Sequence, residues 1–208
     1  MGRPRAALAG LGLLLVLVAA SVASAQVEPG PPGPWVVDLR GVTVPLPSDS
    51  RFLPGLASGT VVPGRAFGFD VGARWFGKAL GPARIAVGVD ATWARGTTVE
   101  SRTSPRVLET FVRVTPDVSF NFGTRNGWSY LSLGGGVARV AGRIERAGVT
   151  TALESSGAVP EVHGGAGARW FMSDHLAVGF DLRLHQLFAG SHTPPSSRFA
   201  VSAGLSLR

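Results

Sequence analysis

Apolar residues alternate with small or charged residues along most of the chain. The alternation is clearest in Phe67–Trp75 and Leu176–Leu184, where every second residue is apolar and the residues between are Gly, Ala, Asp or Arg. Successive side chains of a β-strand point to opposite faces of the sheet, so this period of two predicts strands with one apolar face and one polar face. Eight segments of this kind predict strands: Trp35–Pro45, Arg65–Phe76, Ala83–Arg95, Val107–Phe122, Trp128–Gly142, Gly157–Phe171, His175–Phe188 and Arg198–Arg208.

The connections between these strands alternate in length. After the first, third, fifth and seventh strands they are long or irregular, and the other three are tight. Long connections at one end and short turns at the other are typical of an up-and-down transmembrane barrel whose short turns face the periplasm. The fold expected is therefore all-β, an eight-stranded antiparallel up-and-down transmembrane β-barrel with both chain ends on the periplasmic side. The long connections are Leu46–Gly64, Gly96–Arg106, Arg143–Ser156 and Ala189–Ser197, and the tight ones are Gly77–Pro82, Gly123–Gly127 and Met172–Asp174.

The two faces of the predicted strands differ in charge. The apolar face of the second, third, seventh and eighth strands carries no charge, whereas the opposite face carries both acids and bases. An eight-stranded barrel is just wide enough for side chains to fill it, and buried charges must be paired. We therefore expect a lumen plugged by ionic pairs, although the fifth strand fits either register. The expected lumen network is Asp70, Arg74, Arg84, Asp90, Glu109, Arg113, Asp117, Arg139, Glu161, Arg169, Asp181 and Arg183.

Large aromatic residues lie near the ends of the predicted strands. Such residues form girdles at the two interfaces of a membrane barrel. The expected girdle consists of Trp35, Trp75, Trp128 and Trp170 on the periplasmic side and Trp93 and Phe188 on the other. A soluble periplasmic barrel of lipocalin type, which binds lipid inside, is the alternative, because alternation alone does not say which face is inside. The aromatic placement and the charge-free apolar face favour the membrane barrel.

The N-terminal segment has the layout of a signal peptide. Arg3 and Arg5 precede an apolar run, and Ala23-Ser24-Ala25 provides small residues for cleavage. We expect residues 1–25 to be a cleaved signal peptide, 26–34 a Pro/Gly-rich spacer and 35–208 the barrel. The sequence has 0 Cys, which excludes disulfides and thiolate metal sites. The net charge of +7 is scattered rather than clustered, so we expect no nucleic-acid partner.

A pentapeptide occurs twice. Gly72-Ala73-Arg74-Trp75-Phe76 recurs as Gly167–Phe171, each copy before a tight turn, and the second copy continues into a polar turn and an amphipathic strand. This pattern resembles the OmpA/OmpX-like superfamily of small outer-membrane β-barrel proteins. The resemblance implies a porin-like protein of the Gram-negative (diderm) cell envelope, exported through the periplasm and inserted by the barrel-assembly machinery. Such proteins commonly end in an aromatic residue, whereas this sequence ends Leu205-Ser206-Leu207-Arg208, which makes assembly by that route less secure than the topology.

The sequence predicts a non-enzymatic protein with a structural or loop-mediated interaction role. The histidines, His163, His175, His185 and His192, lack His-x-x-x-His spacing and an adjacent serine placed as in a lipid-A deacylase. We therefore expect no catalytic, cofactor-binding or metal-binding residues, and a lipid-A-modifying outer-membrane enzyme is the alternative. The expected partners are outer-membrane lipid, lipopolysaccharide and an extracellular ligand of the outer loops. Four arginines are placed to pair with lipopolysaccharide phosphates: Arg102, Arg106, Arg143 and Arg146.

Overall fold

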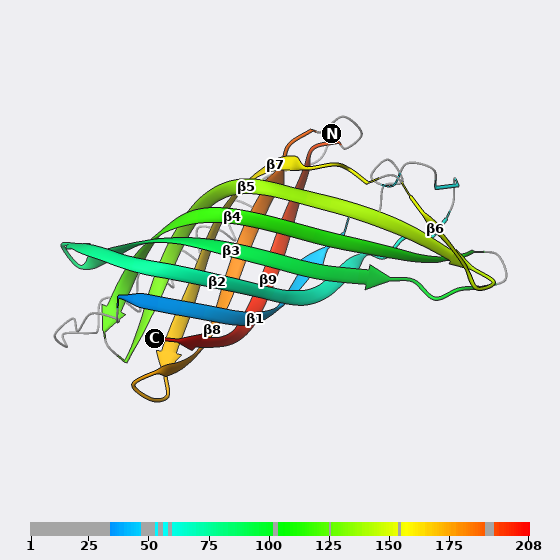
Figure 1. Cartoon of the computed structure of the whole chain (residues 1–208). Coiled ribbons are helices and arrows are strands. Elements are labelled where there is room, and N and C mark those ends of the chain that lie inside the picture. Colours follow the sequence, from blue (N-terminus) through cyan, green and yellow to red (C-terminus); the bar gives the residue numbers. More distant parts are fainter. Residues whose placement is uncertain are drawn as a thin grey trace, which may run out of the picture.

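The computed structural model describes residues 34–46, 53, 56–57, 60–101, 104–124, 126–153, 155–189 and 194–208 (Figure 1). The expected signal peptide and all but the last residue of the expected spacer lie outside these residues, as do Arg102 and His192. The described residues form β-strands and their connections, with no helix among them. No helical segment in this part of the chain has the length and apolarity needed to cross a membrane.

Eight long strands form the wall of the barrel, and each contains most of a strand that the sequence predicts. The first strand has the predicted bounds, and several others extend further than predicted. The long strands are β1 (Trp35–Pro45), β2 (Arg65–Leu80), β3 (Ala83–Thr97), β4 (Arg106–Thr124), β5 (Gly127–Arg146), β7 (Val159–Phe171), β8 (Leu176–Leu187) and β9 (Ser196–Leu207).

A ninth, short strand was not predicted. Within the expected connection Arg143–Ser156, β5 continues to Arg146 and the chain returns as β6 (Val149–Ala152), so residues 143–152 form a hairpin. The turn between them is Ala147-Gly148, with φ angles of 50° and 80°. Positive φ at both central residues is the conformation of the two-residue turns that join hairpin strands. The β5–β6 hairpin projects beyond the barrel wall in Figure 1.

The eight long strands close into one antiparallel ring. Neighbouring strands along the chain pair with each other, β5 pairs with β7, and pairing of β1 with β9 and of β4 with β5 completes the circle. Both ends of the barrel chain lie at one end of the ring, where Val37 pairs with Leu207. We call this end, which has the tight connections, the base, and the opposite end the rim. The predicted eight-stranded up-and-down barrel is confirmed.

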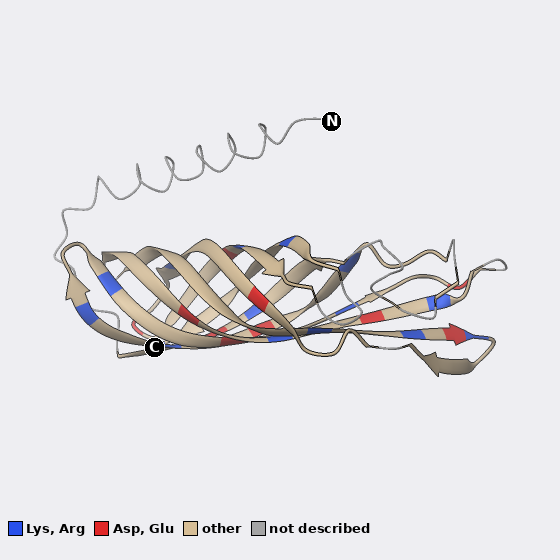
Figure 2. Ribbon diagram, turned by 90° about the horizontal axis from the view of Figure 1, so that it is seen from above, with Lys and Arg blue, Asp and Glu red and all other residues tan. Residues whose placement is uncertain are grey.

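Charged and apolar residues lie on opposite faces of the wall. Large apolar side chains such as Val89, Phe120 and Leu205 are exposed on the outside. Acidic and basic side chains such as Asp38, Asp90 and Arg74 are almost fully buried in the lumen. Figure 2 shows the acidic and basic positions as separate red and blue bands along the strands of the barrel. A lipocalin-type barrel has the reverse distribution, with an apolar interior and charges toward water.

Candidate functional site

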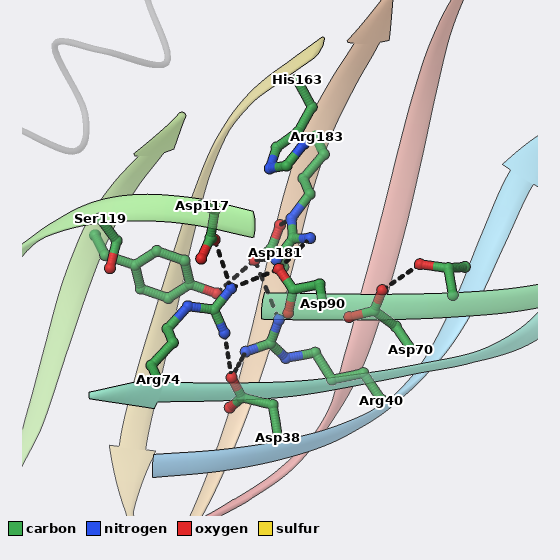
Figure 3. Close-up of polar contacts among 12 residues, drawn as sticks. Asp38, Arg40, Asp70, Arg74, Asp90, Asp117, Ser119, His163, Asp181 and Arg183 are labelled. Carbon is green, nitrogen blue, oxygen red and sulfur yellow. Dashed lines mark hydrogen bonds and ion pairs between the residues drawn. The ribbon is translucent and has the colours of Figure 1, made fainter. Parts of the chain in front are cut away.

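The half of the lumen nearest the base contains a dense layer of ion pairs, part of which is drawn in Figure 3, and Asp38 of β1 contacts three of its arginines. The Asp38 carboxylate lies 2.7 Å from Arg40 Nη2 and accepts hydrogen bonds from the guanidinium groups of Arg74 and Arg169. Ser206 of β9 also donates to this carboxylate. Asp38 therefore connects side chains from four strands, β1, β2, β7 and β9.

The other acids of this layer continue the network. Arg74 Nη2 donates to Asp90 at 2.7 Å and to Asp117 at 2.8 Å. Arg183 Nε donates to Asp181 at 2.9 Å, and the Tyr130 hydroxyl donates to the same carboxylate at 2.6 Å. Four carboxylates thus face four guanidinium groups, which balances the buried charge. We call this set the base layer: Asp38, Arg40, Arg74, Asp90, Asp117, Arg169, Asp181 and Arg183.

The half nearest the rim contains fewer hydrogen bonds between charged groups. Arg113 Nη2 donates to Asp70 at 3.1 Å, and its Nη1 donates to Glu161 at 3.2 Å. Neither carboxylate oxygen of the buried Glu109 has a hydrogen-bond partner. We call this set the rim layer: Asp70, Glu109, Arg113, Glu161, His163, His185 and Arg198.

Histidine and glutamate side chains meet in the rim layer although their sequence spacing did not predict it. Glu161 and His163 lie two residues apart on β7 and therefore point to the same face, and His163 pairs directly with His185 on β8. The Nδ1 atoms of the two histidines lie 3.3 and 3.1 Å from Glu161 Oε1. Ligand spacing along one strand misses such a cluster, because its third member lies across the sheet.

Apolar side chains close both ends of the lumen. At the base, Trp128 packs edge-on against Phe76, with ring centroids 5.7 Å apart, and also contacts Phe171. At the rim, Phe111, Val140 and Leu187 belong to a larger buried apolar cluster. A cavity of about 10 Å³, about the size of one water molecule, lies between the base layer and the charged residues nearer the rim. In the part of the chain that the structure describes, side chains therefore fill the lumen.

The structure places most of the expected network inside the barrel. Ten of the expected residues are buried in the lumen: Asp70, Arg74, Asp90, Glu109, Arg113, Asp117, Glu161, Arg169, Asp181 and Arg183. Arg84 is half-buried, and its Nε donates to the Gly77 carbonyl rather than entering the base layer. Arg139 is exposed on the outside of β5 and donates to Ser155, so its expected place in the lumen is wrong.

Trp128 corrects the expected aromatic girdle. Its side chain is only 5 % exposed and points into the lumen, whereas Trp35, Trp75, Trp93, Trp170 and Phe188 are exposed on the outside. The errors for Trp128 and Arg139 have one cause. The two residues lie on opposite faces of β5, and the predicted orientation turned the wrong face of this strand toward the lumen. The inner face of β5 also contains Gly134, where a Cβ atom would lie 2.5 Å from His163 Cε1. Gly135 lies on the opposite face, so the glycines of this segment do not by themselves select the inner face of β5.

Two central residues of the base layer, Asp38 and Arg40, were missed. They share the inner face of β1 with Val36 and Val42, so this face is mixed rather than polar. Their spacing was a signal in the sequence: Asp38 and Arg40 are two residues apart, and a strand places such residues on the same face.

Arginines gather on the outer face near the rim. Strand pairing places Phe67, Arg95, Thr110 and Ala141 in one row across four strands. Arg139 and Arg143 lie two residues to either side of Ala141, on the same face of β5. Arg65 lies two residues beyond Phe67, on the same face of β2. We call Arg65, Arg95, Arg139 and Arg143, all exposed, the outer arginine belt. Phe69 and Trp93 stack with their centroids 5.5 Å apart, in the same row across the strands as Arg139.

No protein-family model matches the sequence, and neither does any curated protein. Among solved structures, the barrel is similar to Neisserial surface protein A (NspA), with a TM-score of 0.54 and 12 % identity over 84 % of this chain and 97 % of that one. It is also similar to Ail, the attachment invasion locus protein of Yersinia pestis, solved in complex with the heparin analogue sucrose octasulfate. That match has a TM-score of 0.50 and 13 % identity over 83 % of this chain and 95 % of Ail. The chain therefore has the fold of the small eight-stranded outer-membrane β-barrels.

Proposed function

We propose that the protein is an integral outer-membrane β-barrel without enzymatic activity, with a closed lumen and a structural or interaction role at the cell surface. The observation that carries the proposal is the reversal of the usual globular arrangement. Charges such as Asp38 and Arg74 are buried inside, while the outer wall is apolar. Such a wall is stable against acyl chains, and the base then faces the periplasm.

Membrane insertion is tested by cell fractionation together with gel mobility before and after boiling. We expect the protein in the outer-membrane fraction, with a folded form that changes mobility on heating. Recovery in the soluble periplasmic fraction contradicts the proposal.

The closed lumen is supported by three successive barriers: the base plug around Trp128, the paired charges of the base layer, and the apolar cluster around Phe111 at the rim. A solute crossing the barrel must displace at least one buried ion pair, which costs several kcal/mol. In planar bilayers, we expect the purified protein to show no stable large conductance. Stable open-channel currents contradict a closed lumen.

The outer arginine belt supports an interaction with lipopolysaccharide. Its exposed guanidinium groups lie in the row of the aromatic pair Phe69–Trp93 or on its rim side, at the level expected for lipid headgroups. Arginine binds phosphate through paired hydrogen bonds. Of the arginines that the sequence suggested for this role, Arg143 belongs to the belt, Arg146 is exposed on the hairpin, and Arg106 is paired with Glu145 at 3.2 Å.

The lipopolysaccharide interaction is tested with a triple variant, Arg95→Gln, Arg139→Gln and Arg143→Gln. We expect its affinity for purified lipopolysaccharide to fall about tenfold or more, because three charge-assisted contacts are lost. Lys78→Gln, an exposed cation at the base, is the matched control and leaves the affinity unchanged. Equal affinity of the triple variant and the native protein contradicts this interaction.

The absence of lipid-A chemistry is tested by mass spectrometry of lipid A from cells with and without the protein. We expect identical profiles. A change in acylation that depends on the protein contradicts the non-enzymatic proposal.

A further inference from the structure

Three potential metal ligands converge in the rim layer of the lumen. Glu161, His163 and His185 each offer one ligand atom, these atoms lie within 4.8 Å of one another, and all three residues are buried. Glu161 Oε1 is 3.1 Å from His185 Nδ1 and 3.3 Å from His163 Nδ1. Ligand atoms around a tetrahedral Zn²⁺ are about 3.3 Å apart when each lies about 2.0 Å from the ion. Two of the three distances among the ligand atoms therefore match those around a bound Zn²⁺, and all three atoms lie within 4.8 Å of one another.

Hydrogen bonds alone leave this cluster incomplete. Glu161 Oε2 and His163 Nε2 are buried and have no hydrogen-bond partner. His185 Nδ1 faces an acceptor, Glu161 Oε1 at 3.1 Å, and also a donor, Arg113 Nη1 at 3.3 Å. A single imidazole nitrogen either donates or accepts, so it satisfies only one of these neighbours. A metal ion bound here would take the lone pairs of Nδ1 and Oε1 in place of these hydrogen bonds, while Arg113 keeps its bonds to Asp70 and Thr92.

The charge around the cluster also favours a bound cation. The rim layer has three carboxylates, those of Asp70, Glu109 and Glu161, but only two guanidinium groups, those of Arg113 and Arg198. Arg113 is held by Asp70 at 3.1 Å and by Thr92 at 2.7 Å, so it lies beside the three ligands as an anchored neighbour that orients Glu161. The base layer, in contrast, is balanced and offers no surplus negative charge.

We propose that Glu161, His163 and His185 bind a divalent transition-metal ion of the Zn²⁺ class. Two imidazoles and one carboxylate suit Zn²⁺, Cu²⁺ or Ni²⁺, whereas Ca²⁺ and Mg²⁺ prefer oxygen ligands alone. Of the three ligands, His185 lines a small neighbouring cavity that has room for one water molecule. The bound ion cross-links β7 to β8 inside the barrel. Because the apolar rim cluster covers the site, the ion enters while the barrel folds.

The first experiment uses the full chain without a polyhistidine tag, refolded with Zn²⁺ and then freed of loose metal. We expect about one Zn²⁺ per chain by elemental analysis, and none retained by His163→Ala/His185→Ala. The control is His175→Ala, which removes an exposed histidine at the base and leaves the metal content unchanged. Native protein that retains no more Zn²⁺ than the double variant overturns the proposal, as does equal loss in the control.

Two further measurements keep the test independent of variants that fail to fold. Native protein refolded with Co²⁺ is expected to show the intense visible absorption of a four-coordinate site, and Glu161→Gln should weaken Co²⁺ binding at least tenfold. Refolding with Zn²⁺ should also raise the urea midpoint of the native protein, because a ligand bound only by the folded state stabilises it. A pale, six-coordinate Co²⁺ spectrum or an unchanged midpoint overturns the proposal.

Discussion

The base half and the rim half of the lumen solve the problem of buried charge in different ways. In the base layer, each carboxylate contacts at least one guanidinium group within 3.2 Å, and Asp38 contacts three. In the rim layer, Glu109 has no hydrogen-bond partner and two histidines replace further arginines. A buried charge is costly unless it is paired and hydrogen-bonded. The base layer therefore contributes more to a single rigid structure, because each of its carboxylates is paired with a guanidinium group.

The largest expected effect comes from neutralising the centre of the base layer. Asp38→Asn keeps the shape of the side chain but removes the charge that faces Arg40, Arg74 and Arg169. Three guanidinium groups lose a shared partner, so the free energy of unfolding should fall by about 3–5 kcal/mol. Urea unfolding of the refolded protein in lipid vesicles, followed by tryptophan fluorescence, measures the change. A loss below about 1 kcal/mol contradicts the central role of Asp38.

The next effect concerns the base plug. Trp128→Ala removes a ring that packs on Phe76 and Phe171 and lies 5.8 Å from the Arg169 guanidinium. We expect a loss of about 3 kcal/mol, because a large core side chain is replaced by a cavity. Trp170→Ala, on the outer face, is the matched control and should cost about 1 kcal/mol. Equal losses in the same unfolding experiment contradict the inward position of Trp128.

A smaller loss of stability is expected when a charge is placed on the outer wall. This substitution tests whether charge is tolerated only in the interior. Val89→Arg places a charge on the outer face near the middle of β3, and should cost roughly 2 kcal/mol in a bilayer. Val99→Arg, at an exposed position beyond the end of β3, is the control and should cost roughly 0–1 kcal/mol. The comparison fails if both substitutions are equally tolerated in vesicles.

The smallest effect is expected in the rim layer. Glu109→Gln is the counterpart of Asp38→Asn, because each replaces a buried carboxylate by an amide of the same shape. Neither oxygen of Glu109 has a hydrogen-bond partner, so the amide loses none, and the stability should change by about 1 kcal/mol or less. A loss as large as that of Asp38→Asn shows that the two layers do not differ.

The strand pattern was predictable wherever the two faces differ sharply. In β2 and β8 the outer residues are apolar, and the inner ones between Ala66 and Arg74 and between Ala177 and His185 are charged or small, which defined both the strand and its orientation. β5 was ambiguous because Trp128, Tyr130, Val137 and Val140 place bulky apolar residues on both of its faces. Both faces also carry a glycine in Gly134-Gly135-Gly136, so the inner face of β5 is defined by contacts with other strands, such as that between Gly134 and His163.

The candidate site was predictable in composition but not in arrangement. The sequence showed that acids and bases share the inner face, and so predicted a lumen filled by ion pairs. It did not show the division into two layers, because each layer is assembled from strands far apart in the chain. Asp38 and Arg169, for example, are 131 residues apart and yet share two hydrogen bonds.

By itself, the sequence determined the strand periodicity, the strand order and the exclusion of charge from one face, because these depend only on neighbours along the chain. Closure of the ring decided the rest: which acid meets which base, which face of β5 turns inward, and that His163 lies opposite His185. The physical reason is that the narrow interior brings side chains from all eight strands into contact, and the fit among them selects one arrangement.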